Sequence, residues 1–186
     1  MQIRNTQGRY GWVSIILHWG MALLLIGLFI LGKYMITLDY YDPLYLRLPD
    51  LHRSIGVFTA MLLLVRFVWR QLNPVPQIVG SVLERNLALW IHRLFYLLLL
   101  GIVLSGYLTS TADGHALSVF GWFDIPAVLQ GVDNLEDQAG AVHEYLTWSL
   151  VFFVLLHMGA ALKHHYIDKD FSLKRMLGFA PKSGAS

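Results

Sequence analysis

The chain has 186 residues, of which 56% are hydrophobic and 14% are charged, and its formal net charge is +2. This composition is too apolar for an ordinary soluble domain, and so small a net charge gives no reason to expect a nucleic-acid partner. The absence of cysteine excludes disulfides, cysteine-held iron–sulfur clusters and covalent attachment of a cofactor through a C-x-x-C-H motif. Eight histidines are the unusual feature of so apolar a chain.

Long apolar runs are the main organising pattern of the sequence. A bilayer core needs about 20 mainly apolar residues per helix. The first run continues through "MALLLIGLFILG" without a small-residue cleavage site, so we expect a retained helix and not a signal peptide. The sequence predicts an all-α fold, a transmembrane four-helix bundle that forms a single membrane-embedded domain over residues 1–186. The expected spans are residues 12–35, 52–69, 87–107 and 143–164.

The connections between these spans differ in character. Residues 37–51 are rich in Asp, Tyr and Pro, and residues 70–86 contain prolines that cannot continue a helix. Residues 108–142 form a long acidic segment, in which we expect a short helix near Ile125–Leu129. The tail after residue 165 is polar and basic.

The basic residues indicate the orientation, because Lys and Arg are enriched on the cytoplasmic side of membrane proteins. With the N-terminus inside, only Lys33, Arg47 and Arg53 of the 14 Lys and Arg residues fall on the outer side. Most acidic residues fall in the outer loops. The sequence therefore predicts that both termini are cytoplasmic.

This orientation sorts the histidines by depth. His18 and His157 share the cytoplasmic half of the bilayer, whereas His52 and His143 share the outer half. His143 and His157 are 14 residues apart. At about 3.6 residues per turn this is close to four turns, so the two side chains face nearly the same way, about 21 Å apart along the axis.

Two depth-matched histidine pairs indicate two metal-containing cofactors stacked in one bundle. Imidazole is a common axial ligand of haem iron, and helix bundles build cofactor sites from side chains on facing helices. Two imidazoles fill both axial positions, so such a haem would transfer electrons. Zinc is the alternative metal, but neither cysteine nor a pair of acids accompanies these histidines. We therefore expect His18 and His157 to hold one haem, and His52 and His143 the other.

Two further histidines are candidates for the cytoplasmic end. His92 begins the third span and is an alternative to His18 as the partner of His157. His164 follows His157 by seven residues on nearly the same face. Its imidazole suits hydrogen bonding to a quinone carbonyl or proton transfer, or an ordinary position near lipid headgroups. His115 lies in the outer loop, where we expect it to be incidental.

Arginines and small residues are the remaining candidates. Arg66 lies inside the second span, where it would either snorkel to the interface or face a haem propionate or a quinone. Arg53 is a propionate candidate at the outer end. Small residues let a helix backbone approach a flat ring closely, and the glycines in suitable places are Gly20, Gly56, Gly101, Gly106 and Gly159.

Several motifs together resemble the bacterial cytochrome b561 family, and the resemblance extends from about residue 9 to 177. The final motif is the most specific. The motifs are "SIILHW" at 14–19, "DLHRSIG" at 50–56, "WIHRLFYLLL" at 90–99, "AVHEYLTW" at 141–148 and "LLHMGAALKHHYIDKDFSLKRM" at 155–176.

The resemblance implies a multi-pass protein of the bacterial inner membrane with two non-covalent b-type haems. By motif, His18 and His157 would hold the cytoplasmic haem, and His52 and His143 the periplasmic one. The family includes a membrane superoxide oxidase, in which electrons from superoxide reduce ubiquinone. The resemblance also implies contact with ubiquinone near the cytoplasmic end, where His92, His164 and Arg66 match family positions.

The outer loops depart from that superoxide oxidase. The segment "MITLDYYDPLYLRLPDLH" is acidic and rich in tyrosine, whereas an anion such as superoxide is steered by positive potential. These loops look closer to a branch with a periplasmic, lipocalin-like partner protein.

Three hypotheses follow for the function. The first is a dihaem protein that passes electrons between a periplasmic donor or acceptor and the quinone pool, with superoxide:ubiquinone oxidoreductase activity as one version. The second is a membrane-anchor cytochrome b subunit of a larger redox complex. The third is a haem-free, histidine-lined metal or proton transporter. Haem content separates the third from the other two.

Overall fold

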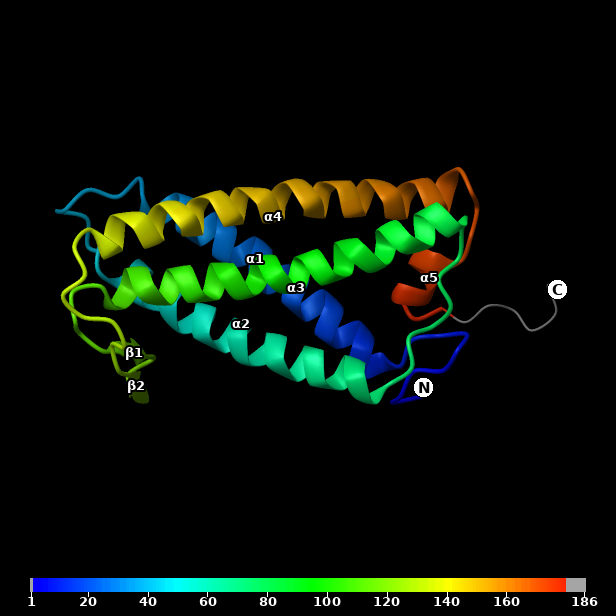
Figure 1. Ribbon diagram of the computed structural model, residues 1–186, viewed down its shortest axis with the longest axis horizontal. Coiled ribbons are helices and arrows are strands. Elements are labelled where there is room, and N and C mark those ends of the chain that lie inside the picture. Colours follow the sequence, from blue (N-terminus) through cyan, green and yellow to red (C-terminus); the bar gives the residue numbers. More distant parts are fainter. Residues whose placement is uncertain (1, 180–186) are drawn as a thin grey trace. The chain divides into compact units, whose positions relative to one another are not determined.

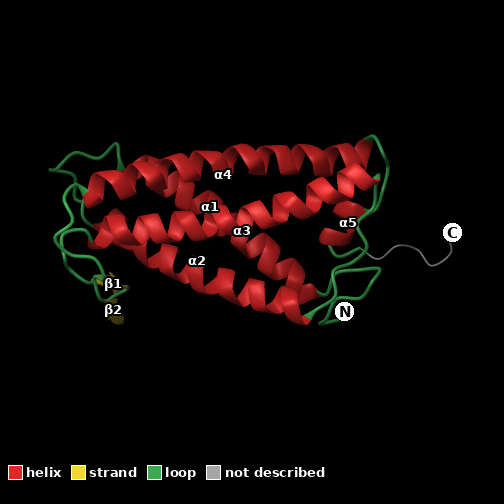
Figure 2. Cartoon of the chain, in the orientation of Figure 1, coloured by secondary structure: helices red, strands yellow, loops and turns green. Residues whose placement is uncertain are grey.

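The fold, seen in a computed structural model that describes residues 2–179, is almost entirely helical (Figure 1). Four long helices and one short helix are joined by loops, and one loop contains a two-stranded hairpin (Figure 2). The elements are α1 (Trp12–Met35), α2 (Arg47–Leu72), α3 (Val82–Thr111), β1 (Leu117–Val119), β2 (Phe123–Ile125), α4 (Leu135–Tyr166) and α5 (Ser172–Met176).

The four long helices confirm the predicted transmembrane four-helix fold. Each is long and apolar enough to cross a membrane, with a mean hydropathy of 1.5 to 2.3 over its most apolar stretch. Many large apolar side chains point outward, such as Leu23 at 70% exposure and Leu97 at 67%. Lipid is the solvent that such surfaces require. The cytoplasmic location of both termini stays a prediction.

The chain divides into two compact units, and each contains one part of every long helix. The terminal unit comprises Met1–Gly20, Leu62–Phe95 and Val151–Ser186, and therefore includes α5. The loop unit comprises Met21–Met61 and Tyr96–Leu150, and therefore includes the hairpin.

Helix α3 begins five residues before the predicted span, because its N-terminus is capped. Ser81 Oγ accepts a hydrogen bond from the Glu84 backbone N–H at 3.3 Å. Glu84 Oε2 in turn accepts from the Ser81 backbone N–H at 2.8 Å. This reciprocal capping box satisfies two donors that an apolar helix end would otherwise leave unpaired.

Helices α2 and α4 also begin earlier than the apolar pattern predicts. Helix α2 includes residues 47–51, which the sequence had assigned to a loop, and Pro49 is tolerated because it lies in the first turn. Helix α4 includes residues 135–142, and Glu136 and Asp137 in its first turn suit the positive end of the helix dipole. These polar turns extend the helices beyond their apolar spans.

The prediction of a short helix near Ile125–Leu129 is wrong. Strands β1 and β2 pair antiparallel, with Leu117 opposite Ile125, and Ile125 ends β2. The residue before a proline favours extended backbone, and Pro126 follows. The Tyr107 hydroxyl then donates to the Pro126 carbonyl at 2.6 Å and accepts from the Val128 N–H at 3.0 Å, which holds these residues as a loop.

The N-terminal segment is fastened to the terminal unit by a chain of hydrogen bonds. Asn5 Oδ1 accepts from the Gly11 N–H at 2.8 Å and the Ser14 hydroxyl at 2.7 Å. The Asn5 side-chain amide donates to the Pro74 carbonyl at 2.9 Å, and Trp69 Nε1 donates to Ser14 Oγ at 2.9 Å. These bonds join the start of α1 to the end of α2 and fix the helix on which His18 lies.

Replacing the cap residue tests the account of α3. We expect Ser81→Ala to lower the free energy of unfolding by about 1 kcal/mol, because it removes one side of the capping box. Denaturation of the purified protein in detergent measures this change. Ser149→Ala is the matched control, since the Ser149 hydroxyl bonds only to Tyr145 O within α4 in the described structure. Equal losses for the two variants would contradict the role of the cap.

Candidate functional site

The outer pair, His52 and His143, lies in the loop unit and joins α2 to α4. Their ring centroids are 6.4 Å apart, and the ring planes are inclined by 75°. His143 Nδ1 lies 2.9 Å from the Ile102 carbonyl oxygen and 3.4 Å from Ser105 Oγ. A carbonyl can only accept, so Nδ1 carries the proton and the lone pair of Nε2 is free to bind a metal.

Two glycines make room for these rings. A Cβ atom on Gly106 would lie 3.0 Å from the Cε1 and Nδ1 atoms of His143. A Cβ atom on Gly32 would lie 3.3 Å from Cε1 of His52. Both distances are shorter than ordinary contact, so a larger residue would displace the imidazole. Gly106, expected from the sequence to face a flat ring, instead backs the ring of His143.

The inner pair, His18 and His157, lies in the terminal unit and joins α1 to α4. It is named for the cytoplasmic side that the sequence predicts. Their ring centroids are 6.5 Å apart, and the planes are inclined by 60°. Phe95 packs edge-on against His157 with centroids 5.6 Å apart.

The spacing of both pairs suits two imidazoles on opposite sides of one iron atom. An imidazole nitrogen binds a first-row metal at about 2 Å and lies about 1 Å from its ring centre, so two opposed rings have centroids about 6 Å apart. Both pairs come close to this value. A structural zinc site needs four protein ligands, and neither pair is part of a group of three or more metal-binding side chains within residues 2–179. The donor set therefore fits haem, whose ring supplies the other ligands.

His92 is also a neighbour of His157, with ring centroids 5.7 Å apart. The structure therefore brings together His157 and both of its predicted partners. The ring centroids of His18 and His157 are 6.5 Å apart, which is within 0.1 Å of the 6.4 Å between the centroids of the outer pair. This repetition favours His18 as the opposing ligand.

The two candidate arginines have different surroundings. Arg66 Nη1 donates to the Leu17 carbonyl at 3.1 Å, and Arg66 Nη2 lies 3.2 Å from His18 Nδ1. Arg53 pairs with Asp50, with Nη1 and Oδ1 3.2 Å apart, and both side chains are largely exposed. Arg66 thus reaches the inner pair, whereas Arg53 forms a surface ion pair.

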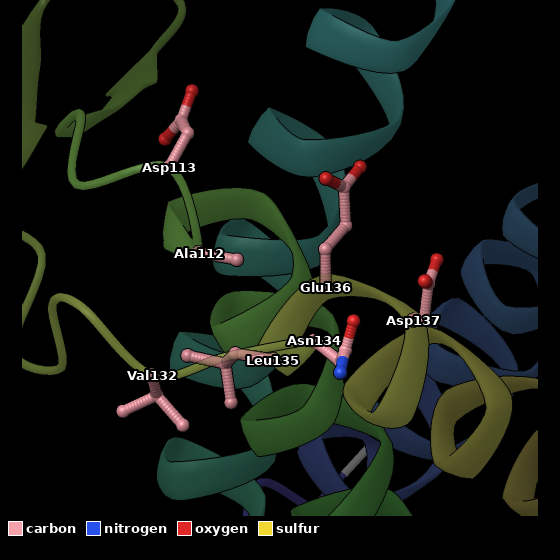
Figure 3. A pocket seen from close by; sticks show the side chains of 7 residues that line it. All are labelled: Ala112, Asp113, Val132, Asn134, Leu135, Glu136 and Asp137. Carbon is pink, nitrogen blue, oxygen red and sulfur yellow. The ribbon is translucent and has the colours of Figure 1, made fainter.

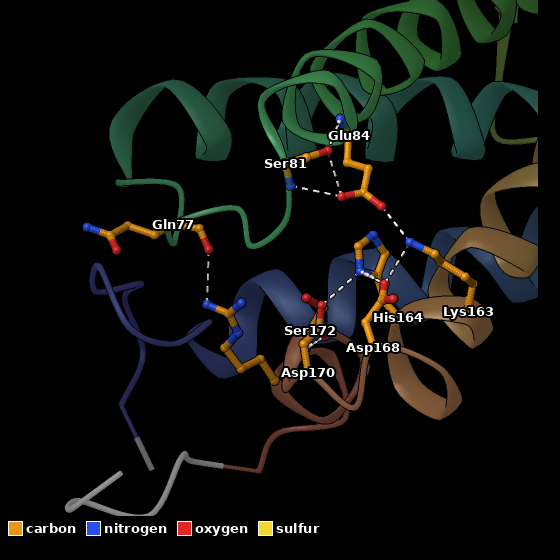
Figure 4. A network of polar contacts seen from close by, with 9 residues as sticks. Gln77, Ser81, Glu84, Lys163, His164, Asp168, Asp170 and Ser172 are labelled. Carbon is orange, nitrogen blue, oxygen red and sulfur yellow. Dashed lines mark hydrogen bonds and ion pairs between the residues drawn. The ribbon is translucent and has the colours of Figure 1, made fainter. Parts of the chain in front are cut away.

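His164 belongs to a polar network in the terminal unit (Figure 4). Its Nδ1 atom lies 3.0 Å from Asp168 Oδ2 and 2.8 Å from Asp170 Oδ2. The Lys163 ammonium bridges Glu84 and Asp168. Glu84, His164 and Asp168 are close enough to share a metal ion, but Lys163 already supplies a positive charge there. We therefore interpret this network as an ion-pair cluster that fixes the His164 ring.

Helix α5 closes this end of the terminal unit. Trp19 Nε1 donates to the Met176 carbonyl at 3.0 Å, and Arg175 is buried with Nη1 bonded to the Gln77 carbonyl at 3.1 Å. Burial raises the pKa of the Tyr10 hydroxyl, and the nearby guanidinium groups, including Arg175 and Arg66, oppose this rise. Basic groups thus converge at this end.

A separate hollow of about 260 Å³ lies in the loop unit, where α3 ends and α4 begins (Figure 3). Asp113, Glu136 and Asp137 contribute to its lining, and no histidine does. His115 lies outside it, 85% exposed, with Nδ1 3.0 Å from Asp113 Oδ2. The hollow is therefore distinct from both histidine pairs.

Several residues that shape the site were not singled out from the sequence. Gly32 backs His52, and the carbonyl of Ile102 orients His143. Both effects depend on contact between helices, which no spacing within one helix reveals. Asp168 was accessible to sequence reasoning, since it follows His164 by four residues.

Comparisons with known proteins identify the family of the chain. A family model for the prokaryotic cytochrome b561 matches residues 9–179. "Cytochrome b561 homolog 2" of Escherichia coli (strain K12) is 48% identical over 180 residues, which cover 96% of each chain. "Cytochrome b561 homolog 1" of the same organism is 30% identical over 137 residues, covering 72% of this chain and 76% of the relative. "Probable superoxide oxidase CybB" of Yersinia pestis is 30% identical over 173 residues, covering 91% of this chain and 96% of the relative.

The match covers nearly all of the described residues and includes all four spanning helices. Four spanning helices, together with the match to the prokaryotic cytochrome b561 model, make the chain a multi-pass protein of the bacterial inner membrane. The chain therefore belongs to the prokaryotic cytochrome b561 family of membrane electron-transfer proteins, which implies b-type haem.

Proposed function

We propose that this protein holds two b-type haems and passes electrons across the membrane between a redox partner at the outer face and the quinone pool. The observation that carries the proposal is the repeated histidine geometry, with ring centroids 6.5 Å apart in one pair and 6.4 Å apart in the other. Two ligand pairs of equal spacing are what two haems of one type require.

In this proposal, His18 and His157 hold the cytoplasmic haem, and His52 and His143 hold the periplasmic one. A haem held by two imidazoles would supply one-electron transfer at each site. The Ile102 carbonyl keeps the proton of His143 on Nδ1, which leaves Nε2 as the ligand atom. The histidine pairs thus fix the position and the electronic character of the cofactors.

We place the quinone reaction near His164 in the terminal unit. Reduction of a quinone to a quinol takes two electrons and two protons, so a site needs a proton donor at its mouth. In the protonated ring, Nδ1 lies within ion-pair distance of Asp168 and Asp170, and Nε2–H is the group that would donate to a quinone carbonyl. The half-buried ring supports this role, since its side chain is 19% exposed. Ubiquinone is the quinone that the family resemblance favours.

The electron donor at the outer face has two candidates. A relative is named as a probable superoxide oxidase, so superoxide is one candidate donor for this chain. The acidic outer loops oppose the steering of an anion. A redox protein is the alternative donor, and a periplasmic lipocalin-like partner stays a prediction.

The other two hypotheses have less support. Membership of a cytochrome family favours haem over a haem-free metal or proton transporter. A role as the anchor subunit of a larger complex would use the same haems but would need a partner for quinone reduction. Quinone reduction by the isolated chain therefore distinguishes the two remaining functions.

Visible spectroscopy of the detergent-purified protein is the first test. We expect a pyridine haemochrome count of two b-type haems per chain and a low-spin reduced spectrum. A soluble ubiquinone analogue should reoxidise the reduced protein. Retention of both haems without reoxidation would favour the anchor-subunit function. A colourless protein, produced with sufficient haem, would contradict the proposal.

Ligand variants test the pairing. We expect His143→Ala and His18→Ala each to lose one of the two haems, because each removes one axial ligand. The haem count per chain is the measurement, and His115→Ala is the control because His115 is exposed. Two normal haems in both variants would show that the ligand assignment is wrong.

Gly106→Ala tests the packing behind the outer pair. Its added methyl group would lie 3.0 Å from the His143 ring, so we expect a shifted spectrum or reduced occupancy for one haem. Gly27→Ala is the matched control, since a Cβ there meets no atom within 4 Å. Indistinguishable spectra for the two variants would contradict the positioning role of Gly106.

A further inference from the structure

Arg66 is a charged side chain inside α2, next to the inner pair. Its Nη2 atom lies 3.2 Å from His18 Nδ1, and its Nη1 atom donates to the Leu17 carbonyl at 3.1 Å. These contacts point the guanidinium at His18. An arginine that snorkelled to the interface would instead direct its charged end toward headgroups. The structure therefore favours a role beside the histidines.

Among the described residues, no acid balances the charge of Arg66. Within residues 2–179, no carboxylate forms an ion pair with it, and its neighbours are the Leu17 carbonyl and the His18 ring. The acidic groups of the network around His164 pair instead with Lys163 and His164. A guanidinium remains protonated in proteins, so this positive charge is permanent. Charged groups within membrane spans are costly and mark functional sites.

The outer pair has a different electrostatic environment. His143 Nδ1 is hydrogen-bonded to the neutral Ile102 carbonyl. The arginine of that helix end, Arg53, is paired with Asp50 and largely exposed, so solvent and its partner screen its charge. Only the inner pair thus has an unpaired guanidinium within hydrogen-bonding distance among the described residues.

A permanent positive charge acts differently on the two oxidation states of a nearby centre. It favours the state that has gained an electron, and the effect is larger where the surroundings are apolar. When Nε2 of His18 is the ligand atom, Nδ1 carries the proton and cannot accept from Arg66. The guanidinium fork is then available to a carboxylate such as a haem propionate. Pairing with that carboxylate would act in the same direction, by neutralising a negative charge.

We infer that Arg66 is the positioning cation of the inner haem site and raises its reduction potential relative to the outer site. The inference rests on the proposed function, because it concerns the haem that His18 and His157 would hold. Electron transfer from the outer site to the inner one is then favourable. Arg66 and His164 both belong to the terminal unit, so the favoured direction leads toward the proposed quinone site.

A redox titration of the purified, haem-loaded protein tests the inference. The titration uses a His143→Ala background, in which only the inner haem contributes. We expect Arg66→Gln to lower the electron affinity of this haem about tenfold, a shift of about 59 mV for a one-electron couple. Arg66→Lys should keep most of the parental potential because it keeps the charge. Arg85→Gln removes an exposed charge at the start of α3 and should leave the potential unchanged.

The possible outcomes distinguish a failure of the proposed function from a failure of the role of Arg66. A His143→Ala background that retained no haem at all would contradict the proposed function itself. A normal haem with the same potential in Arg66→Gln and the parent would overturn only the role of Arg66. If Arg66→Gln lost the haem and Arg66→Lys kept it at the parental potential, charge would be what the site requires. Loss of haem in both variants would show that the shape of the side chain matters instead, which would also overturn the inference.

Discussion

The opposition of two imidazole rings across facing helices is the constraint on which the rest of the structure depends. In the proposed haem sites each pair would need its rings about 6 Å apart to share one metal, so the helices that carry them would have to be held at a fixed separation. Helix α4 supplies one ring to each pair, and α1 and α2 supply the others. Glycines behind the rings of the outer pair permit this approach, because any side chain would push the imidazoles aside.

The apolar surroundings impose a second requirement, which is that every other polar group be satisfied locally. Hydroxyl groups within the helices donate to the carbonyl one turn earlier, as Thr59 does to Ile55 and Thr147 to His143. Trp69 finds its acceptor in Ser14. The histidines and Arg66 are polar side chains inside the spans that contact one another instead.

Charged side chains are distributed differently in the two units. The terminal unit contains Arg66 beside the inner pair and the network around His164. The loop unit contains the acidic hollow and the exposed pair of Arg53 with Asp50. Each unit thus has its own histidine pair and its own arrangement of charged side chains.

The sequence by itself determined the four spanning helices and the two groups of histidines. Hydropathy and the position of a residue within a span can both be read along the sequence. It also pointed to His18, His52, His143 and His157, whose proximity is observed while their ligand roles stay predictions. The structure shows that α3 begins before its apolar span, because the local Ser81–Glu84 cap lies outside the apolar pattern. It also replaced the expected helix near residue 125 with a hairpin, and placed Gly32 behind His52 and Arg66 beside His18. The positions of Gly32 and Arg66 arise from contacts between helices distant in sequence, whereas the cap and the hairpin are local interactions that lie outside the periodicity of any one helix.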